Sequence, residues 1–186
     1  MRLRDKVLAT MKSRDTEGAF ELYVTRTPGY LWALLFRRLG VHPIAVTLAS
    51  IAIGAAAGYF FYFPSREMNL IGMLLLVWAN WYDCADGQLA RMTGKKTLIG
   101  RILDGFAGDV WFFCIYLAIA LRLTHAWTGL ADFMQHDAWV WALMAWAGLH
   151  CHSRQCALAD YYRNIPLWFL LGKQGSELDT SREEKR

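Results

Sequence analysis

The sequence predicts an all-α protein, folded as a polytopic bundle of helices in a membrane. Hydrophobic residues make up 55% of its 186 residues, and the 19% that are charged are bunched along the chain. A soluble domain of this size would spread its charges over its whole surface. Four apolar runs also approach or exceed the roughly 20 residues that cross a bilayer. Together these observations favour four visible transmembrane helices.

The four expected transmembrane helices occupy residues 42–63, 69–87, 98–121 and 138–162. The first is free of charged residues, whereas the other three carry polar groups at one end. Tryptophans in these runs, Trp111 among them, are expected to face lipid or to anchor the helices at the interface.

The Lys and Arg residues predict how the helices are oriented. Eight precede residue 42 and four lie around the turn between the second and third runs, but residues 64–68 and 122–137 hold only one each. Positive residues favour the cytoplasmic side. We therefore expect an integral protein of the cell (inner) membrane, with both termini and the 88–97 loop in the cytoplasm.

The chain divides by composition into a leader, a membrane domain and a tail, at residues 1–41, 42–165 and 166–186. Within the leader, residues 16–39 mix aromatic and basic residues. This mixture predicts an amphipathic helix in the membrane interface, broken near Pro28 and Gly29. A soluble cap packed on the cytoplasmic face is the alternative.

Several classes of protein are disfavoured. The net charge of +4 is too small and too dispersed for a protein that binds a nucleic acid polymer. The four cysteines lie inside or at the ends of apolar runs, without a CxxC pair, so a disulfide framework is not expected.

Four aspartates crowd into the 27 residues from Asp83 to Asp109. Asp83 and Asp86 are three residues apart and share one face of the second helix. Asp104 lies at a matching depth on the third helix, because the 88–97 turn returns the chain across the same interface. Acids at membrane depth are costly unless they face a cavity, a partner or an ion.

A hard divalent cation resolves the repulsion among these acids. Carboxylate oxygens suit Mg²⁺, Mn²⁺ or Ca²⁺, and no His/Cys set at zinc-ligand spacing accompanies them. Four carboxylates could hold two ions, as in sites that clamp phosphate oxygens. The alternative is an Asp–Arg network that only pins helices together, but the apolar flanks offer just Arg91 and Arg101 for four acids.

The residues around the acids suit a phosphate ligand. Gly87 allows a close backbone approach, Ala90 keeps a groove open and Arg91 can bind phosphate through two hydrogen bonds. Gly94 and Gly100 permit a tight reversal and close contact between helices.

This pattern, D-x-x-D-G-x-x-A-R followed after eight residues by G-x-x-x-D, resembles the signature of the CDP-alcohol phosphotransferase (CDP-alcohol phosphatidyltransferase) family, which comprises integral membrane enzymes of phospholipid synthesis. The matching residues are Asp83, Asp86, Gly87, Ala90, Arg91, Gly100 and Asp104. The HPIAVT segment is also similar to the family's Pro-x-x-x-Thr entry to the first helix. Thr47 would then reach the nucleotide; a helix start with a back-bonded threonine is the alternative.

The resemblance implies that an alcohol attacks the β-phosphorus of a CDP-linked lipid, such as CDP-diacylglycerol, and that CMP leaves. Mg²⁺ or Mn²⁺, as two ions, would be held mainly by Asp83, Asp86 and Asp104. Asp109 would act as the general base and contact a metal as well. The nucleotide pocket would be lined by Gly87, Ala90, Arg91 and Gly100.

The chain departs from the family pattern in two ways. The signature continues D-x-x-x-D, but here four residues separate Asp104 from Asp109. In a regular α-helix a five-residue step leaves two side chains about 140° apart. We expect a π-type turn to bring Asp109 into the fourth position; otherwise Asp109 faces elsewhere and activity is altered or lost.

The second departure is that six transmembrane helices are the family norm, against four here. We expect either a piece of a longer protein, or a homodimer or partner that supplies the missing helices.

The acceptor is predicted from basic residues near the end of the fourth helix. Arg154 and Arg163 would bind an inositol or inositol phosphate acceptor, by analogy with family members that use inositol phosphate. The alternatives are snorkelling to the headgroups, favoured for Arg163, and an Arg154–Asp160 pair. A second hypothesis for the whole chain is a non-enzymatic membrane protein that binds or carries a divalent cation.

Overall fold

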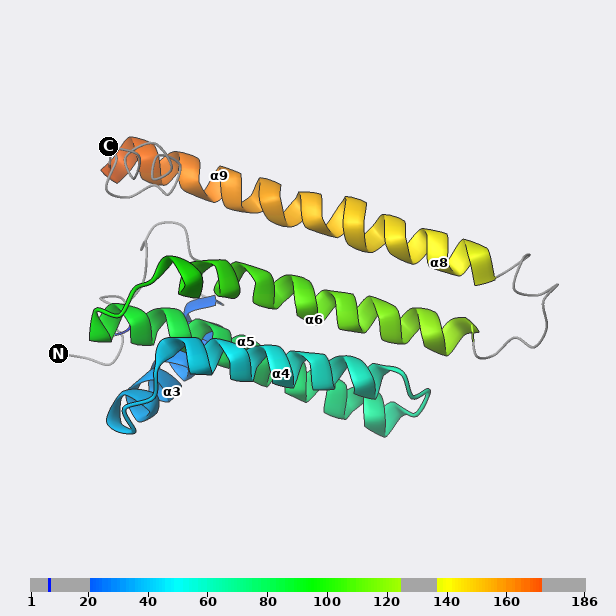
Figure 1. The fold of residues 1–186 in the computed structure, drawn as a ribbon, viewed down its shortest axis with the longest axis horizontal. Helices are drawn as coiled ribbons and strands as arrows, with labels where there is room; N and C mark the ends of the chain where they lie inside the picture. Colours follow the sequence, from blue (N-terminus) through cyan, green and yellow to red (C-terminus); the bar gives the residue numbers. More distant parts are fainter. Residues whose placement is uncertain (1–6, 8–20, 125–136, 172–186) are drawn as a thin grey trace. The chain divides into compact units, whose positions relative to one another are not determined.

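The computed structural model describes residue 7, residues 21–124 and residues 137–171, and every element within them is helical (Figure 1). The chain divides into two compact units, with the boundary between Met144 and Ala145. The predicted all-α class is confirmed for the described residues.

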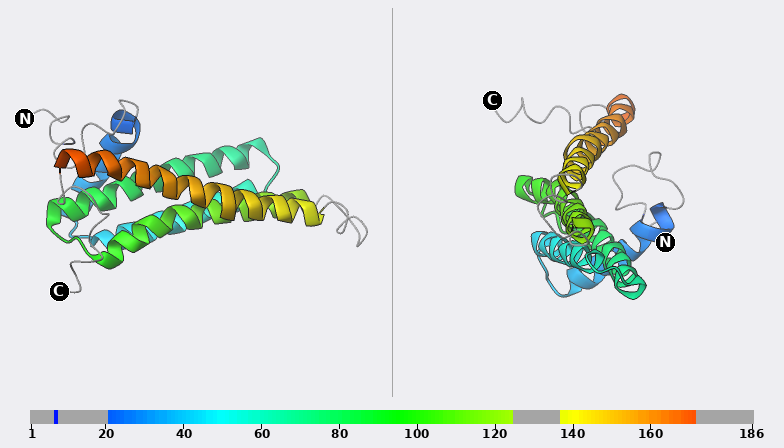
Figure 2. Two further views of the ribbon diagram at one scale, coloured as in Figure 1. Left: turned by 90° about the horizontal axis from the view of Figure 1, so that it is seen from above. Right: turned by 90° about the vertical axis from the view of Figure 1, so that its right-hand side faces the viewer.

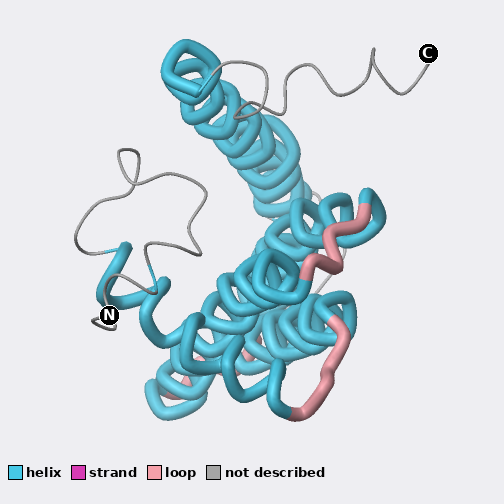
Figure 3. Tube along the Cα trace, turned by 90° about the vertical axis from the view of Figure 1, so that its left-hand side faces the viewer, coloured by secondary structure: helices cyan, strands magenta, loops and turns pink. Residues whose placement is uncertain are grey.

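Three long helices form the centre of the first unit: α4 (Pro43–Phe61), α5 (Arg66–Thr93) and α6 (Leu98–Thr124). Short loops join them (Figure 3). Helix α4 packs along both α5 and α6, whereas α5 and α6 meet over only a few residues (Figure 2). Helix α4 therefore connects the other two.

The helix ends follow from capping residues. His42 Nδ1 accepts a hydrogen bond from the Ile44 amide at the start of α4, and Ser65 Oγ accepts from the Met68 amide at the start of α5. Gly94, with a φ of 69°, ends α5 in the left-handed conformation that glycine favours. Thr97 Oγ1 then accepts from the Gly100 amide at the start of α6. The reversal expected at Gly94 is confirmed.

Helices α4 and α5 run antiparallel. A methyl group added at Gly72 would lie 3.1 Å from the carbonyl oxygen of Ala57, while Asp86, further along α5, contacts Thr47 near the start of α4. This register carries the second half of α5, with its aspartates, to the first turns of α4.

Helices α4 and α6 run parallel and pack through small residues. Gly58 faces Cys114, whose Cβ would be 2.7 Å from an added methyl group, and Gly54 faces the indole ring of Trp111. Trp111 is only 5% exposed. The expectation that it faces lipid is wrong, because the missing side chain of Gly54 leaves room for the ring in the core.

The N-terminal segment is helical through the expected break. A π-helix, η1 (Leu22–Arg26), leads directly into α3 (Thr27–Arg38), which has Pro28 in its first turn, where proline is tolerated. The Thr25 hydroxyl donates to the Glu21 carbonyl at 2.7 Å and the Thr27 hydroxyl to the Leu22 carbonyl at 2.8 Å. In place of the expected break, the helix changes from π to α between Arg26 and Thr27.

Helix α3 packs on α5 through aromatic rings. Trp32 and Phe36 on α3 lie 5.0 and 5.2 Å from the ring of Tyr82, measured between centroids. Tyr30 and Ala33, on the same side, are buried. The segment thus rests on α5; its position in the membrane interface stays a prediction.

The C-terminal helices follow one another without a gap from residue 138 to residue 171, as α8 (Ala138–Ala145), η3 (Trp146–His152) and α9 (Ser153–Leu171). The fourth predicted run, 138–162, is helical throughout.

Two helices of the described residues, α4 and α6, are long and apolar enough to cross a membrane. Helices α5 and α9 do not meet the same criterion, since each mixes polar residues into its apolar run, and α8 and η3 are too short to meet it. That the second and fourth predicted runs, residues 69–87 and 138–162, also cross the membrane stays a prediction.

Candidate metal and substrate site

Three carboxylates from two helices lie together in the first unit. Asp83 and Asp86 on α5 and Asp104 on α6 each offer an oxygen atom, and these atoms lie within 4.8 Å of one another. We call this set the acidic triad. The prediction that the 88–97 turn brings Asp104 to the depth of the other two is confirmed.

The acidic triad is buried at one end and open at the other. Asp86 is 3% exposed, Asp83 is partly buried and Asp104 is exposed. A ligand would therefore approach from the Asp104 side, with Asp86 at the closed end of the site.

Thr47 contacts the buried end of the triad. Its hydroxyl donates a hydrogen bond to Asp86 Oδ2 and also lies 3.3 Å from the Pro43 carbonyl. A hydroxyl has one hydrogen, and the closer carboxylate is the stronger acceptor. The hydroxyl hydrogen therefore goes mainly to Asp86, and the contact with the Pro43 carbonyl, which is the expected back-bonding contact, is the weaker of the two. Contact between Thr47 and a nucleotide stays a prediction.

The acidic triad suits a hard divalent cation. Asp104 acts electrostatically on both Asp83 and Asp86, and the three negative charges repel one another in a poorly hydrated place. Carboxylate oxygens are the ligands that Mg²⁺, Mn²⁺ and Ca²⁺ prefer. A cation among them would remove the repulsion, so these residues fit such a group.

Gly87 directly follows Asp86 on α5, and Arg91 lies one turn beyond Gly87. A methyl group added at Gly87 would be 3.5 Å from a terminal nitrogen of Arg91, so the guanidinium folds back over the glycine. Ala90 between them is partly buried. A guanidinium held over Gly87, the neighbour of Asp86 in the chain, can bind a phosphate group that enters the site.

A family model described as CDP-alcohol phosphatidyltransferase matches residues 40–167, which contain α4, α5, α6 and the acidic triad. The chain belongs to the CDP-alcohol phosphatidyltransferase family. Comparisons with curated proteins and with solved structures find no match.

As a member of the CDP-alcohol phosphatidyltransferase family, the chain is a transferase of a membrane-integral, phospholipid-synthesising family that acts on a CDP-linked alcohol and an alcohol acceptor. Divalent metals serve the family generally, and the acidic triad could hold one. The resemblance drawn from the aspartate motif is confirmed.

Asp109 lies outside the acidic triad. Helix α6 is α-helical from Leu98 to Thr124, so the π-type turn expected between Asp104 and Asp109 is not there. Asp109 is exposed, and the five-residue step places it about 140° around the helix from Asp104. Its function as a base or metal ligand stays a prediction.

The functions predicted for Gly100, Arg154 and Arg163 stay predictions, and the structure gives only their positions. Gly100 lies in the first turn of α6, where an added methyl group would be 3.0 Å from Thr97 Oγ1. Arg154 is exposed on α9. Arg163 also belongs to α9, but its side chain and that of Asp160 lie outside the described residues.

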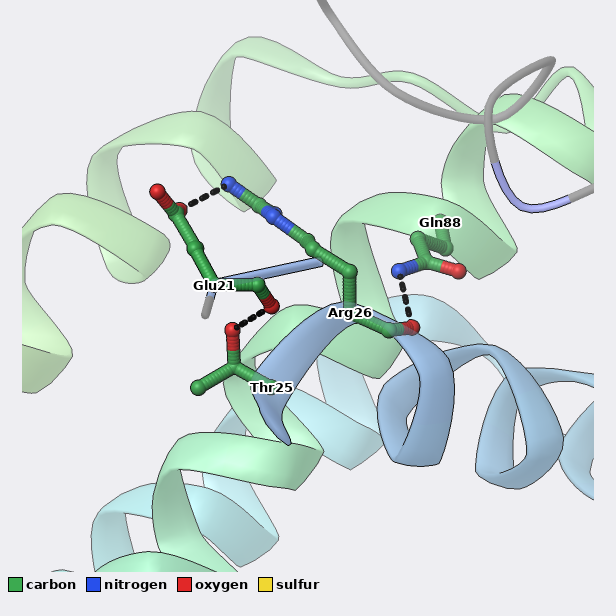
Figure 4. Close-up of polar contacts among 4 residues, drawn as sticks. All are labelled: Glu21, Thr25, Arg26 and Gln88. Carbon is green, nitrogen blue, oxygen red and sulfur yellow. Dashed lines mark hydrogen bonds and ion pairs between the residues drawn. The ribbon is translucent and has the colours of Figure 1, made fainter. Parts of the chain in front are cut away.

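Two residues near the acidic triad were missed in the sequence. Gln88 is fully buried, and its Nε2 donates to the carbonyl oxygen of Arg26 at 3.1 Å, as Figure 4 shows. The Arg26 guanidinium forms an ion pair with Glu21, also at 3.1 Å. Gln88 occupies an unspecified position of the motif, and Arg26 is one of several basic residues in a segment predicted to be an amphipathic helix. The sequence therefore did not indicate that either residue lies near the acidic triad.

Proposed function

We propose that this protein transfers a phosphatidyl group from a CDP-linked lipid, such as CDP-diacylglycerol, to a polar alcohol and releases CMP. The acidic triad is the observation that supports this most strongly. Its carboxylates come from two helices and lie at the motif's spacing, and the Arg91 guanidinium lies over Gly87, next to Asp86 in the chain.

In the reaction, the acceptor oxygen forms a new bond to the β-phosphorus of the CDP-linked lipid. The bond from that phosphorus to the bridging oxygen breaks, and CMP leaves with this oxygen. The acceptor's proton passes to Asp109, the proposed general base. Because α6 is regular at this point, Asp109 would reach the acceptor only after a local rotation or widening of α6.

Asp83, Asp86 and Asp104 would hold Mg²⁺ or Mn²⁺, as two ions, with Asp109 as a further contact. Bound divalent cations supply charge neutralisation on the phosphate oxygens during the displacement. Thr47 orients Asp86 and faces the nucleotide. Arg91 binds the diphosphate.

The small residues Gly87, Ala90 and Gly100 would complete the nucleotide pocket. They leave room for the ligand beside Arg91, because none of them has a side chain larger than a methyl group.

We place the transmembrane catalytic domain at residues 42–165, with the acidic triad on the cytoplasmic side of the inner membrane. There the water-soluble nucleotide and the acyl chains of the lipid can reach one site. Inositol or inositol phosphate is the proposed acceptor, bound by Arg154 and Arg163, because arginine guanidiniums bind phosphate groups.

The deciding experiment measures CMP release by the purified full chain with CDP-diacylglycerol and Mg²⁺ or Mn²⁺. Inositol, inositol 1-phosphate, glycerol 3-phosphate and serine are offered separately as acceptors. We expect metal-dependent release with one acceptor, lost in the Asp104→Asn variant. Absence of release with every acceptor and both metals would contradict the proposal.

A divalent-cation carrier is the second candidate, since the acidic triad alone would serve it. The two functions differ in what they need from Arg91. Arg91→Lys keeps the charge but loses two-pronged phosphate binding, so a transferase should lose affinity for the CDP-linked lipid and a carrier should not. Arg101→Lys, at an exposed arginine of α6 that is not one of the motif's fixed residues, is the matched control.

A further inference from the structure

Helix η1 is held along the part of α5 that carries the acids. Trp81 Nε1 donates to the Val24 carbonyl at 2.9 Å, and Gln88 Nε2 donates to the Arg26 carbonyl at 3.1 Å. Trp81 precedes Asp83 in α5, and Gln88 follows Asp86. These two contacts therefore place Arg26 beside the stretch of α5 that contains both triad aspartates.

The start of α3 fixes the same segment more tightly. A methyl group added at Gly29 would be 2.8 Å from Cys84 Cβ and 3.3 Å from the Trp81 carbonyl. Cys84 is the neighbour of Asp83 in the chain. The backbone that carries Arg26 is thus in direct contact with α5 at the acidic triad.

The Arg26 side chain is bonded to one acid and lies near a second. It is 17% exposed and pairs with Glu21 at 3.1 Å (Figure 4). It also lies within electrostatic range of Asp83. The π-helix makes the first contact possible, because residues five apart lie nearly above one another in the i→i+5 register.

We infer that Arg26 is a positioning residue of the transferase site, which competes with a divalent cation for Asp83 and binds a phosphate oxygen of the CDP-linked lipid. The inference rests on the proposed function. A guanidinium and a divalent cation repel each other across the same carboxylate. The diphosphate of the substrate is the anion that the reaction brings to this place, and arginine binds phosphate with two parallel hydrogen bonds.

The inference gives two effects of opposite sign. Arg26→Gln removes the competing charge, so the affinity for Mn²⁺ should rise about 10-fold. The same change removes a phosphate contact, so the affinity for the CDP-linked lipid should fall about 10-fold. A residue that merely supports the fold would weaken both.

The test uses the full chain in detergent micelles. Electron paramagnetic resonance of free Mn²⁺ gives the metal affinity without any turnover, and CDP-diacylglycerol binding at saturating Mn²⁺ is followed by tryptophan fluorescence. Arg37→Gln, at an exposed arginine near the end of α3, is the control for the loss of one positive charge. We expect it to leave both affinities unchanged.

Glu21→Gln provides a second variant if Arg26→Gln fails to fold. It frees the guanidinium for Asp83, so we expect Mn²⁺ affinity to fall, opposite to Arg26→Gln. Weaker or unchanged Mn²⁺ binding in Arg26→Gln overturns the inference, and so does stronger binding in Glu21→Gln.

The outcome is separable from that of the proposed function. The Mn²⁺ affinities of Arg26→Gln and Glu21→Gln could shift in opposite directions while the wild type releases no CMP. This result would contradict the transferase reaction but support the competition between Arg26 and the cation for Asp83. CMP release with no Arg26 effect would overturn only the inference. Absence of Mn²⁺ binding in the wild type would overturn the inference and the proposed metal site together.

Discussion

The hydroxyl of Thr47 on α4 donates a hydrogen bond to the carboxylate of Asp86 on α5. Helix α4 supplies no acid to the triad, yet this contact orients the most buried of its carboxylates. Groups that orient a metal-binding carboxylate commonly affect metal affinity nearly as much as the ligands themselves.

Thr47→Val should weaken Mn²⁺ binding about 10-fold, because the methyl group replaces the donor to Asp86. Thr47→Ser keeps the hydroxyl and should bind nearly as well as the wild type. Ser50→Ala is the control, since Ser50 is equally buried on α4 but donates to the Thr47 carbonyl. Unchanged Mn²⁺ affinity in Thr47→Val, measured by paramagnetic resonance, would show that the hydroxyl does not orient a ligand.

Asp86→Asn should lower Mn²⁺ affinity by more than about 100-fold and abolish CMP release. The amide keeps the shape of the side chain but loses its charge at the closed end of the site. Isothermal titration with Mn²⁺ and the CMP assay measure the two effects. Full metal affinity in this variant would mean that the triad is not the metal site.

Asp109→Asn should slow CMP release by about 10²–10⁴-fold but weaken Mn²⁺ binding much less than Asp86→Asn does, because a general base and one further metal contact are lost while the triad is intact. Comparing kcat with Mn²⁺ affinity separates the two. Retained activity would show that the regular α6 of the structure is also the working form and that another group takes the proton.

Gly54→Ala should destabilise the protein by about 1–3 kcal/mol, since the added methyl group overlaps the buried ring of Trp111. Gly108→Ala on α6 meets nothing within 4 Å and should be neutral or stabilising by about 0.5–1 kcal/mol, as expected for alanine in a helix. Thermal unfolding in detergent measures both. An equal loss of stability in the two variants would contradict the packing described for α4 and α6.

Trp81→Phe should loosen η1, because the ring remains but the hydrogen bond to the Val24 carbonyl is lost, at about 1 kcal/mol. Faster hydrogen–deuterium exchange across Leu22–Arg26 is the expected result. Trp78→Phe, one turn earlier on α5, changes an indole that stacks on Trp32 and serves as the control. Equal exchange in both variants would show that Trp81 does not hold η1.

The central helices and the acidic triad could be predicted from local signals. Two aspartates three residues apart must share a helix face, and a short basic turn must return the next helix to the same end. These rules need only the chain within about 20 residues of Asp86. They correctly brought Asp104 to Asp83.

The rest depends on contacts between distant segments. Thr47 meets Asp86 across 39 positions of sequence, and Gln88 meets the Arg26 carbonyl across 62. Trp111 is buried because Gly54, on another helix, leaves room for its ring. Hydropathy alone treats that tryptophan as an anchor, since it carries no information about which helix faces it.

The π-helix was expected in the wrong place. Two residues five apart, Asp104 and Asp109, predicted a widened turn in α6, but among the described residues the π-helices are η1 (Leu22–Arg26) and η3 (Trp146–His152), and the pair five apart in the first of them is Glu21 and Arg26. There the pair carries opposite charges, and threonine hydroxyls occupy the carbonyls of Glu21 and Leu22. Two like charges give α6 no such reason to leave the regular α-helix.

Helices α5 and α6 carry the acids but touch only briefly, so α4 sets the distance between them. Mg²⁺ requires oxygens at about 2.0–2.1 Å, whereas Ca²⁺ accepts about 2.3–2.6 Å and more ligands. A slightly thicker side chain along α4, far from any carboxylate, would spread Asp104 from Asp83 and favour the larger ion. The choice between divalent cations at the proposed site would therefore depend on substitutions in α4, a helix that supplies no carboxylate to the acidic triad.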